Sequence, residues 1–389
     1  MSRPFIYMLL GLNLWLSACV EPFNPDIKNY ENALVVEGHM LEGKNPARVI
    51  LSRTFAFDED KPEYISGAIV YIRDDKGKEH RLVAKGNGVY ESDTTVVRGE
   101  PGRSYQLVIE TADGKSYEST WQFMKKGAAI ESINPRFETY VTGFDTLMGM
   151  QLYLNTSSSD QNSRFYRWEF EETWMFRVPY PARGYWDIAN KQPVFVEPDS
   201  IRRTCYKSEK SVDIILNTTE GLAEDKIVDY PFLYISTETD RLTLKYSILL
   251  KQYTLSEEAY DYWRVTKEIN QELGTLFDPI PTDITGNIQN VDDPDEPVIG
   301  YFSADGFSQK RIFIDRLDVP PVLIPTGLEN CPYIFFSNID DMQRYVLAGN
   351  AWVGAVADFA GNILGYTGST KKCSDCTVQG DLKKPAFWP

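Results

Sequence analysis

The amino-acid sequence predicts a mainly β protein with two successive β-rich domains behind an N-terminal secretion signal. Aromatic and β-branched residues recur in short runs separated by Gly, Pro, Asn and Asp, which is typical of strands and turns. With 389 residues, of which 42% are hydrophobic and 13% aromatic, the chain can bury two ordinary cores. Only one stretch, at about residues 256–273, shows clear helical periodicity.

The N-terminus carries the pattern of a bacterial lipoprotein signal. Arg3 precedes an apolar run over residues 5–16, which suits a secretory signal and is too short for a transmembrane helix. The run ends in residues 16–19, with the letters LSAC, which resemble a lipobox. We therefore expect residues 1–18 to be a signal peptide, and Cys19 to become the acylated mature N-terminus. An ordinary signal peptide with an incidental cysteine is the alternative.

The residues after the cysteine indicate the cellular location of the protein. Val20 is not the aspartate that resembles an inner-membrane retention signal, so an outer-membrane destination is favoured. Glu21 and Asp26 look like a sparse acidic leader of a surface-exposed lipoprotein. Residues 19–32 have little to bury and are expected to form a flexible tether. The expected location is therefore the cell outer membrane, with a lipid anchor and a surface-exposed body.

The formal net charge of −16 limits the partners of this body. Phosphate binding needs clustered Lys and Arg, so nucleic acid is not expected as a partner. The same charge argues against electrostatic docking on anionic lipid. A solvated acidic surface that keeps a secreted protein soluble is the simplest interpretation.

Residues 33–125 are predicted to form a β-sandwich of Ig-like or transthyretin-like topology. Short strand patterns follow one another with turns between them, and Asp113-Gly114 is a strong hairpin signal. The predicted strands are residues 33–37, 48–52, 68–72, 80–83, 88–92, 105–109 and 117–121. Domains of this kind usually serve as spacers or contact platforms.

Residues 126–389 are predicted to form a larger β-rich domain with one amphipathic helix. In the strand predicted at residues 164–177, aromatic and charged side chains take opposite faces. The aromatic face holds Tyr166, Trp168 and Phe170, and the charged face holds Arg167, Glu169 and Glu171. Further strands are expected at residues 147–156, 212–217, 232–237 and 242–253, with strand pairs at 298–303 with 310–315 and at 352–358 with 363–367.

The one helix has an N-terminal signal of its own. Ser256 is a plausible N-cap, and Glu257 and Glu258 in the first turn are favourable to the helix dipole. Apolar residues then recur at three- and four-residue spacing, which predicts packing on a sheet.

A long loop between Val178 and Ser200 is the first candidate for a contact surface. Its rings, Tyr180, Tyr185 and Trp186, do not follow a strand period. Exposed rings on a long loop often mark a surface that meets a ligand or a partner.

Four cysteines remain when Cys19 is set aside as a lipid site. They are Cys205, Cys331, Cys373 and Cys376, and in an oxidising space an even set predicts two disulfides. Spacing does not choose among the three pairings. A local bridge within residues 373–376 and a zinc site of four thiolates are the alternatives. The closing residues are expected to be stapled to the body.

No catalytic, metal or cofactor motif is found. The two histidines, His39 and His80, both fall in the first domain, so a triad with histidine is not available to the second domain. A hydrolase with two carboxylates stays open, although no acid pair is singled out by an apolar pocket. The acidic residues 292–296 lack the spacing of a calcium loop and are expected to be solvated.

Short motifs along nearly the whole mature chain resemble the domain-of-unknown-function 4249 family of Bacteroidota outer-membrane lipoproteins. They lie at residues 34–38, 67–70, 88–90, 246–249, 253–260, 286–288, 300–302, 310–314, 373–376 and 384–388. The resemblance implies a lipoprotein that works beside a TonB-dependent receptor of the SusC-like type, as an accessory or ligand-capturing subunit. It implies no catalytic residues. A free-standing surface adhesin or glycan-binding protein is the alternative function.

Overall fold

The computed structural model describes residues 33–54, 62–93, 97–143, 145–159, 163–272 and 286–389. Within them the chain is mainly β, as the sequence predicts, and the strands form several sheets with few helices. None of the described helices combines the length and the apolar character needed to cross a membrane. The predicted signal peptide, Cys19 and the tether lie outside the described residues.

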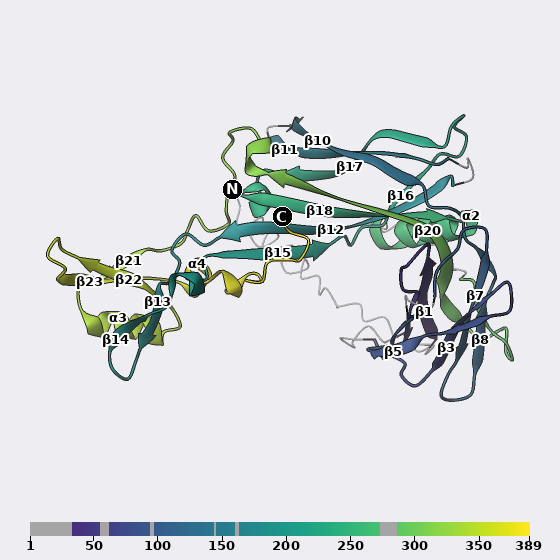
Figure 1. The fold of residues 1–389 in the computed structure, drawn as a ribbon, viewed down its shortest axis with the longest axis horizontal. Coiled ribbons are helices and arrows are strands. Elements are labelled where there is room, and N and C mark those ends of the chain that lie inside the picture. The colour runs from purple at the N-terminus through teal and green to yellow at the C-terminus, as the bar shows by residue number, and fades with distance from the viewer. Residues whose placement is uncertain (1–32, 55–61, 94–96, 144, 160–162, 273–285) are drawn as a thin grey trace, which may run out of the picture.

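One nine-stranded sheet runs through both β-rich parts of the molecule (Figure 1). Its strands are, in spatial order, β15 (Thr204–Lys210), β12 (Phe165–Arg177), β18 (Lys245–Leu255), β20 (Val298–Asp315), β1 (Leu34–Leu41), β2 (Arg48–Arg53), β6 (Val89–Glu91) and β5 (Val83–Gly86), with β16 (Ile215–Thr218) paired to β12.

Strand β20 joins the two parts of this sheet. Its first half pairs in parallel with β1, and its second half pairs antiparallel with β18. The prediction of two separate strands at 298–303 and 310–315 is therefore wrong. Asp305-Gly306 looks like a turn in the sequence. In the structure Gly306 lies inside the strand, where an added Cβ would stand 2.5 Å from the backbone nitrogen of Gly127.

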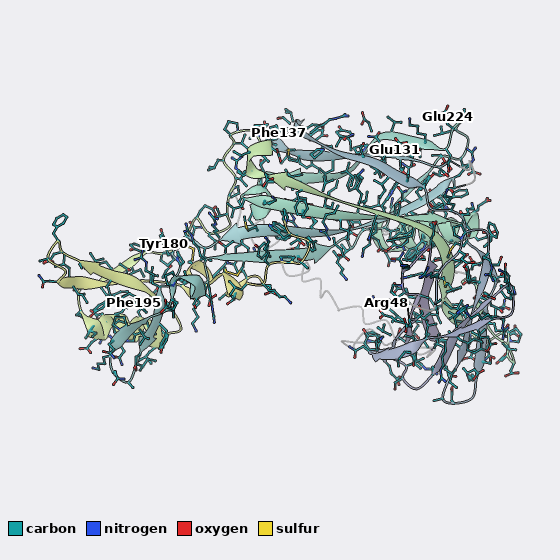
Figure 2. All side chains as sticks on the ribbon, in the orientation of Figure 1. Arg48, Glu131, Phe137, Tyr180, Phe195 and Glu224 are labelled. Atoms are coloured by element: carbon teal, nitrogen blue, oxygen red, sulfur yellow. A yellow bond between two sulfur atoms is a disulfide. The ribbon has the colours of Figure 1, made fainter. Side chains whose placement is uncertain are left out.

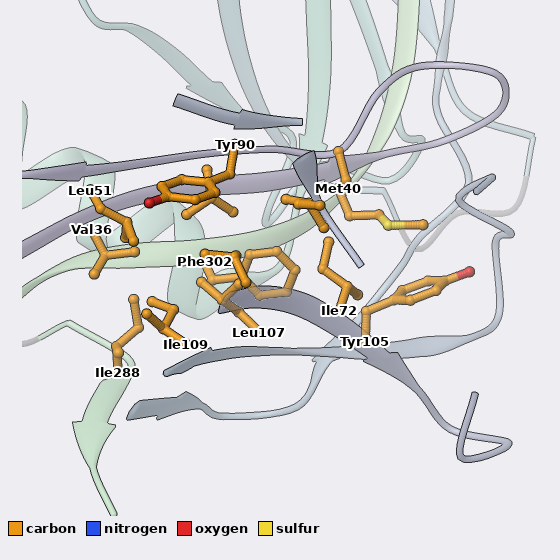
Figure 3. Packing of buried hydrophobic residues seen from close by; sticks show 14 of the residues in the cluster. Val36, Met40, Leu51, Ile72, Tyr90, Tyr105, Leu107, Ile109, Ile288 and Phe302 are labelled. Atoms are coloured by element: carbon orange, nitrogen blue, oxygen red, sulfur yellow. The ribbon is translucent and has the colours of Figure 1, made fainter. Parts of the chain in front are cut away.

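The first sandwich-like part is completed by a six-stranded sheet. It contains β19 (Ile288–Asn290), β8 (Ser116–Ser119), β7 (Ser104–Glu110), β3 (Ile69–Asp74), β4 (Glu79–Arg81) and β9 (Gln122–Phe123). The apolar core between its sheets includes Val36, Tyr90 and Leu107 (Figure 3). Ile288 and Phe302 enter the same core from far along the chain. The strands predicted for residues 33–121 are confirmed, except that the one at 80–83 is divided between β4 and β5, which lie in different sheets. The Ig-like topology stays a prediction.

The second sandwich-like part places a three-stranded sheet over the other half of the long sheet. Its strands are β10 (Ala129–Thr142), β11 (Asp145–Ser157) and β17 (Lys226–Ser236). Tyr166, Trp168 and Phe170 of β12 lie in the core between the layers. The prediction of opposite aromatic and charged faces on β12 is thus confirmed, and its charged face turns away from this core.

Helix α2 (Glu257–Lys267) lies where the first part joins the second (Figure 1). The side chain of Ser256 accepts a hydrogen bond from the Ala259 backbone N–H, so the predicted N-cap is confirmed. Ala259, Tyr262 and Trp263 pack against residues of both parts. A π-helical turn, Glu268–Glu272, follows the helix.

A small distal module lies at the far end of the second part (Figure 1). It contains a hairpin of β13 (Gly184–Asp187) and β14 (Gln192–Phe195), a sheet of β21 (Ile334–Phe336), β23 (Ile363–Ser369) and β22 (Ala351–Ala357), and helix α3 (Ile339–Leu347). The helix α4 (Lys371–Ser374) and short 3-10 turns at Pro198–Ser200, Asp240–Leu242, Arg316–Asp318 and Cys376–Val378 complete the described elements.

The distal module corrects two predictions. The stretch between Val178 and Ser200 contains a hairpin where a loop was predicted, and the second domain has more than one helix. The helix α3 begins after Asn338, whose side chain accepts a hydrogen bond from the Asp341 backbone N–H.

Candidate functional site

The distal module is built around two buried indole rings. Trp186 of β13 is 5% exposed and packs with Trp352 of β22 and Met342 of α3. The rings of Trp186 and of Tyr366 of β23 form a T-shaped pair with a centroid distance of 5.1 Å. These contacts join the hairpin, the helix and the sheet in one core, so the module has a defined shape of its own.

Polar contacts fasten the hairpin to α3 from the outside. The Lys191 ammonium lies 3.0 Å from the Asp340 carboxylate, and the Gln343 side chain donates to the Ile188 carbonyl at 3.3 Å. Both contacts are exposed and contribute little energy by themselves. Their effect is to hold the hairpin in one orientation.

Two disulfides fix the module to the body, which confirms the prediction of two bridges. Cys205 of β15 is bonded to Cys376, and Cys331 is bonded to Cys373 of α4. The local bridge and the zinc alternative are therefore wrong. Each bridge joins positions far apart in the chain, so each restricts the unfolded chain strongly.

The C-terminal tail lies against the body beyond these bridges. The Trp388 ring packs between Tyr206 and Phe313, at centroid distances of 5.1 and 5.6 Å. The Arg311 guanidinium stacks on Phe387 at 3.5 Å. The tail thereby covers strands β15 and β20 and positions Cys376.

The surface of the module carries many exposed apolar side chains. They are Tyr185, Ile188, Phe195, Phe335, Leu347, Val356, Phe359, Ile363 and Leu364. Figure 2 labels Phe195 on the module and Tyr180 at its base. A concentration of exposed apolar surface of this kind marks a site of interaction with a protein or a membrane.

Phe359 is fully exposed at the tip of the β22–β23 hairpin. Its turn is organised by Asp358, whose carboxylate accepts hydrogen bonds from the backbone N–H groups of Ala360 and Asn362 at 2.9 and 2.8 Å. The Asn362 side chain also donates to this carboxylate at 2.8 Å, and these hydrogen bonds lower the pKa of Asp358. A well-formed turn thus presents an apolar ring to solvent.

The three predicted contact residues have different surroundings. Tyr180 packs on Tyr333 at a centroid distance of 4.8 Å, at the base of the module. Tyr185 is exposed on the hairpin, whereas Trp186 lies in the module core. Their role in contact stays a prediction, and the geometry leaves Tyr185 the most accessible of the three.

Tyr185 and Trp186 also line a pocket of about 430 Å³ between the hairpin, β22 and α4. Arg202 and Asp375 stand in its wall and pair at 2.9 Å. Burial alone would raise the pKa of Asp375. Hydrogen bonds from the Thr377 hydroxyl and from Arg202 outweigh burial and lower it.

Three residues of this pocket contribute buried polar groups that have no hydrogen-bond partner within the described parts of the chain. They are the indole N–H groups of Trp186 and Trp352 and the hydroxyl of Ser374. Leaving such a group unpaired costs about 1–3 kcal/mol. A ligand oxygen that reached these groups, after a small movement of the walls, would recover that energy.

The two histidines lie far along the chain from this module, in the first part. The His80 ring stands 3.3 Å from the Asp74 carboxylate. His39 lies on β1 and faces a groove at the bend of the long sheet. Among the described residues, no group of three or more His, Cys, Asp or Glu could hold a metal ion.

Sequence reasoning missed α3 and the exposed hairpin tip. An N-cap signal at Asn338, with Asp340 and Asp341 in the first turn, was available for the helix. The strand pair at 352–358 and 363–367 was predicted, but no exposed apolar side chains were expected at its tip. The exposure of Phe359 could not be predicted, because it depends on which sheet the hairpin joins in the folded protein.

Comparisons with known proteins point to one family. A family model described as "Domain of unknown function (DUF4249)" matches residues 20–311, and no curated protein matches the sequence.

Two solved structures are weakly similar. A DUF4785 family protein from Legionella pneumophila shows 10% identity over 56% of this chain and 51% of that one, with a TM-score of 0.17. Trypsin-activated alpha-2-macroglobulin from Escherichia coli shows 11% identity over 58% of this chain and 15% of that one, with a TM-score of 0.17. The chain thus spans about half or less of these proteins, and scores this low carry no argument.

Proposed function

The chain belongs to the family described as domain of unknown function 4249, and on that premise we propose that it is a binding protein of the cell envelope. It is anchored in the outer membrane through acylated Cys19. Its distal module docks on a membrane protein partner, a TonB-dependent receptor barrel of the SusC-like type, for which it is an accessory or ligand-capturing subunit.

The observation that carries the docking role is the exposed apolar surface of the distal module. Phe359, Ile363 and Leu364 project from one hairpin, and Phe195 and Tyr185 project from the other. Apolar residues at the centre of a contact, above all aromatic ones, supply most of the binding energy of protein interfaces. The disulfides reduce the entropy that the module would lose on binding, because its shape is already set.

The anchor supports a partner in the same membrane. The 14 residues expected to form the tether reach roughly 45–50 Å when extended, which is enough to hold the body over a barrel. Tethering to one membrane also raises the effective concentration of the two proteins. Modest contact energy in the module then suffices for a stable complex.

The test is recovery of partners with the full-length lipoprotein from outer membranes in mild detergent, followed by mass spectrometry. The variant Phe359→Ser/Leu364→Ser removes apolar surface from the hairpin. The variant Val212→Ser is the matched control, because Val212 is also highly exposed but lies on the second sandwich.

The proposal expects a receptor barrel with the wild type and with Val212→Ser, and at least about tenfold less with the double variant. Absence of any barrel from the wild-type preparation, or equal recovery by the double variant, contradicts it. Recovery of lipid alone would assign the apolar tip to the membrane surface.

A free-standing glycan-binding protein is the second candidate, favoured by the indole N–H groups beside the 430 Å³ pocket. Glycan-array binding by the soluble form, lost in Tyr185→Ala, supports this function. Trp186→Ala is less informative, because Trp186 lies in the module core and its truncation would open a cavity.

A further inference from the structure

A groove of about 720 Å³ lies on the face of the long sheet that turns away from both cores. It follows the bend where β20 passes from β1 to β18. Strands from both parts line it, and Tyr262 and Trp263 of α2 close one side. Arg48, labelled in Figure 2, stands on the side of the first part.

Two pairs of charged side chains lie at the margins of the groove. The Lys251 ammonium lies 2.6 Å from the Glu171 carboxylate. Arg48 stands 3.8 Å from Glu91. In each pair the opposite charges offset each other.

Arg167 is also paired, with Glu169, but through one of its nitrogens. It is 8% exposed, and its guanidinium lies over two rings, at 4.3 Å from the centre of Tyr253 and 4.2 Å from that of Trp263. Among the described residues, its Nη1 alone has a hydrogen-bond partner, the Glu169 carboxylate at 2.5 Å. Nε is covered and unpaired, and Nη2 also donates to none of the described residues. The rings therefore hold a guanidinium whose second edge is unpaired, and a ligand reaches the Nε end of that edge only when the groups that cover it move.

Glu169 is itself held in place. The Tyr253 hydroxyl donates to its other oxygen at 2.8 Å. Burial would raise the pKa of Glu169, but the charge of Arg167 and this hydrogen bond lower it. The carboxylate thus stays ionised and orients Arg167 without occupying its free edge.

Two buried titratable groups, His39 and Asp305, also lie at the bend. Burial, and then the charge of Arg167, lower the pKa of His39 to about 4, so its ring is neutral. Burial raises the pKa of Asp305 to about 7. The Ser303 hydroxyl donates to one oxygen of Asp305 at 2.7 Å, and the other oxygen has no partner in the described chain.

We propose that this groove binds a small ligand through a carboxylate group, with Arg167 as the residue that recognises it. A guanidinium offers a carboxylate two parallel N–H donors. A singly charged group is favoured over phosphate, because Glu169, Glu171 and Glu91 would repel a dianion. Trp263 and Tyr262 offer apolar walls to the rest of the ligand. This site is separate from the docking surface of the distal module.

The carboxylate has two plausible sources, a uronic acid or the C-terminus of a short peptide. Titration calorimetry on the whole mature protein distinguishes them with two pairs of probes. One pair is trigalacturonate and its neutral methyl ester. The other is trialanine and trialanine amide.

The decisive variant is Arg167→Lys, which keeps the positive charge and loses the two-donor edge. At least one carboxylate probe is expected to bind the wild type, and its neutral partner to bind at least about tenfold more weakly. Arg167→Lys is expected to weaken the carboxylate probe by about tenfold or more. The Tyr185→Ala variant, changed in the distal module, is expected to bind as the wild type does.

A second measurement protects the test against a fold defect in Arg167→Lys. Because Trp263 lies on the guanidinium, the fluorescence of the wild type should change when a carboxylate binds, and Trp263→Phe should remove that change. The proposal is overturned if neither carboxylate probe binds the wild type, if the neutral probes bind equally well, or if folded Arg167→Lys binds unchanged.

Discussion

The groove at the bend and the distal module differ in how they expose their binding residues. In the groove, Arg167 is buried, stacked on rings and oriented by Glu169. On the module, Phe359 and Leu364 project into solvent from a short hairpin. The first arrangement suits a small ligand of defined chemistry, and the second suits a protein partner with a large surface of complementary shape.

The two regions also differ in what holds them together. The groove is formed by central strands of one sheet, so hydrogen-bonded neighbours on both sides fix it. The module has a small core of its own and depends on Cys331–Cys373 and Cys205–Cys376 at its base. Small cores gain most from covalent cross-links. It should therefore be possible to disable one region without the other.

Removal of the Cys331–Cys373 bridge is expected to have the largest effect. Cys331→Ser/Cys373→Ser should cost the module about 2–5 kcal/mol of stability, because its 42-residue separation is no longer closed. Limited proteolysis should then cut within residues 334–369, and partner recovery should fall. Ligand binding in the groove should persist, and its loss would show that the two regions are not independent.

A substitution of Asp305 should alter how the stability of the protein depends on pH. Its folded pKa of about 7 lies above the unfolded value, so its stabilising contribution is complete below about pH 4 and is lost as the pH rises through 7. In urea denaturation at pH 8, the free energy of unfolding of Asp305→Asn should therefore exceed that of the wild type by at most about 4 kcal/mol. At pH 4 the two proteins should have the same free energy of unfolding.

Comparing Asp305→Asn with the wild type at each pH separates the effect of Asp305 titration from that of His39 titration. The lowered pKa of His39 acts in the opposite sense, since its contribution is present above about pH 6.5 and is lost as the pH falls through 4. The difference between Asp305→Asn and wild type leaves His39 in both proteins. A difference that does not grow from pH 4 to pH 8 would contradict the assignment.

A smaller effect is expected at the tail that supports the module. Arg311→Gln removes the stacking of its guanidinium on Phe387 and should cost about 1 kcal/mol. Hydrogen exchange should increase in residues 381–389. Exchange in the groove strand β12 should not change, and an increase there would show that the tail supports the whole sheet.

The smallest effect is expected for an exposed ion pair remote from both regions. Arg136 and Asp229 pair at 2.8 Å, and both side chains are nearly half exposed. Arg136→Gln should change stability by less than about 1 kcal/mol, and the change should shrink in high salt. Partner recovery and ligand binding should both stay at the wild-type level.

Much of the fold could be read from local patterns, and the sites could not. The opposite faces of Arg167 and Trp168 follow from the two-residue period of a strand, and Ser256 is recognisable as an N-cap from its neighbours. The helix α3 was missed although Asn338 carries a similar signal. The exposed tip at Phe359 and the stacked guanidinium of Arg167 were not predicted, because neither has a motif.

The sequence by itself determined the mainly β class, most strand positions and the even cysteine set that forms two disulfides. Each of these depends on neighbours within a few residues, or on simple counting. Only the tertiary structure decided which cysteines pair, that β1 lies beside β20, and that Trp263 and Tyr253 enclose Arg167. The reason is physical. Which distant segments pair depends on the burial of both cores together, and no local sequence pattern contains that information.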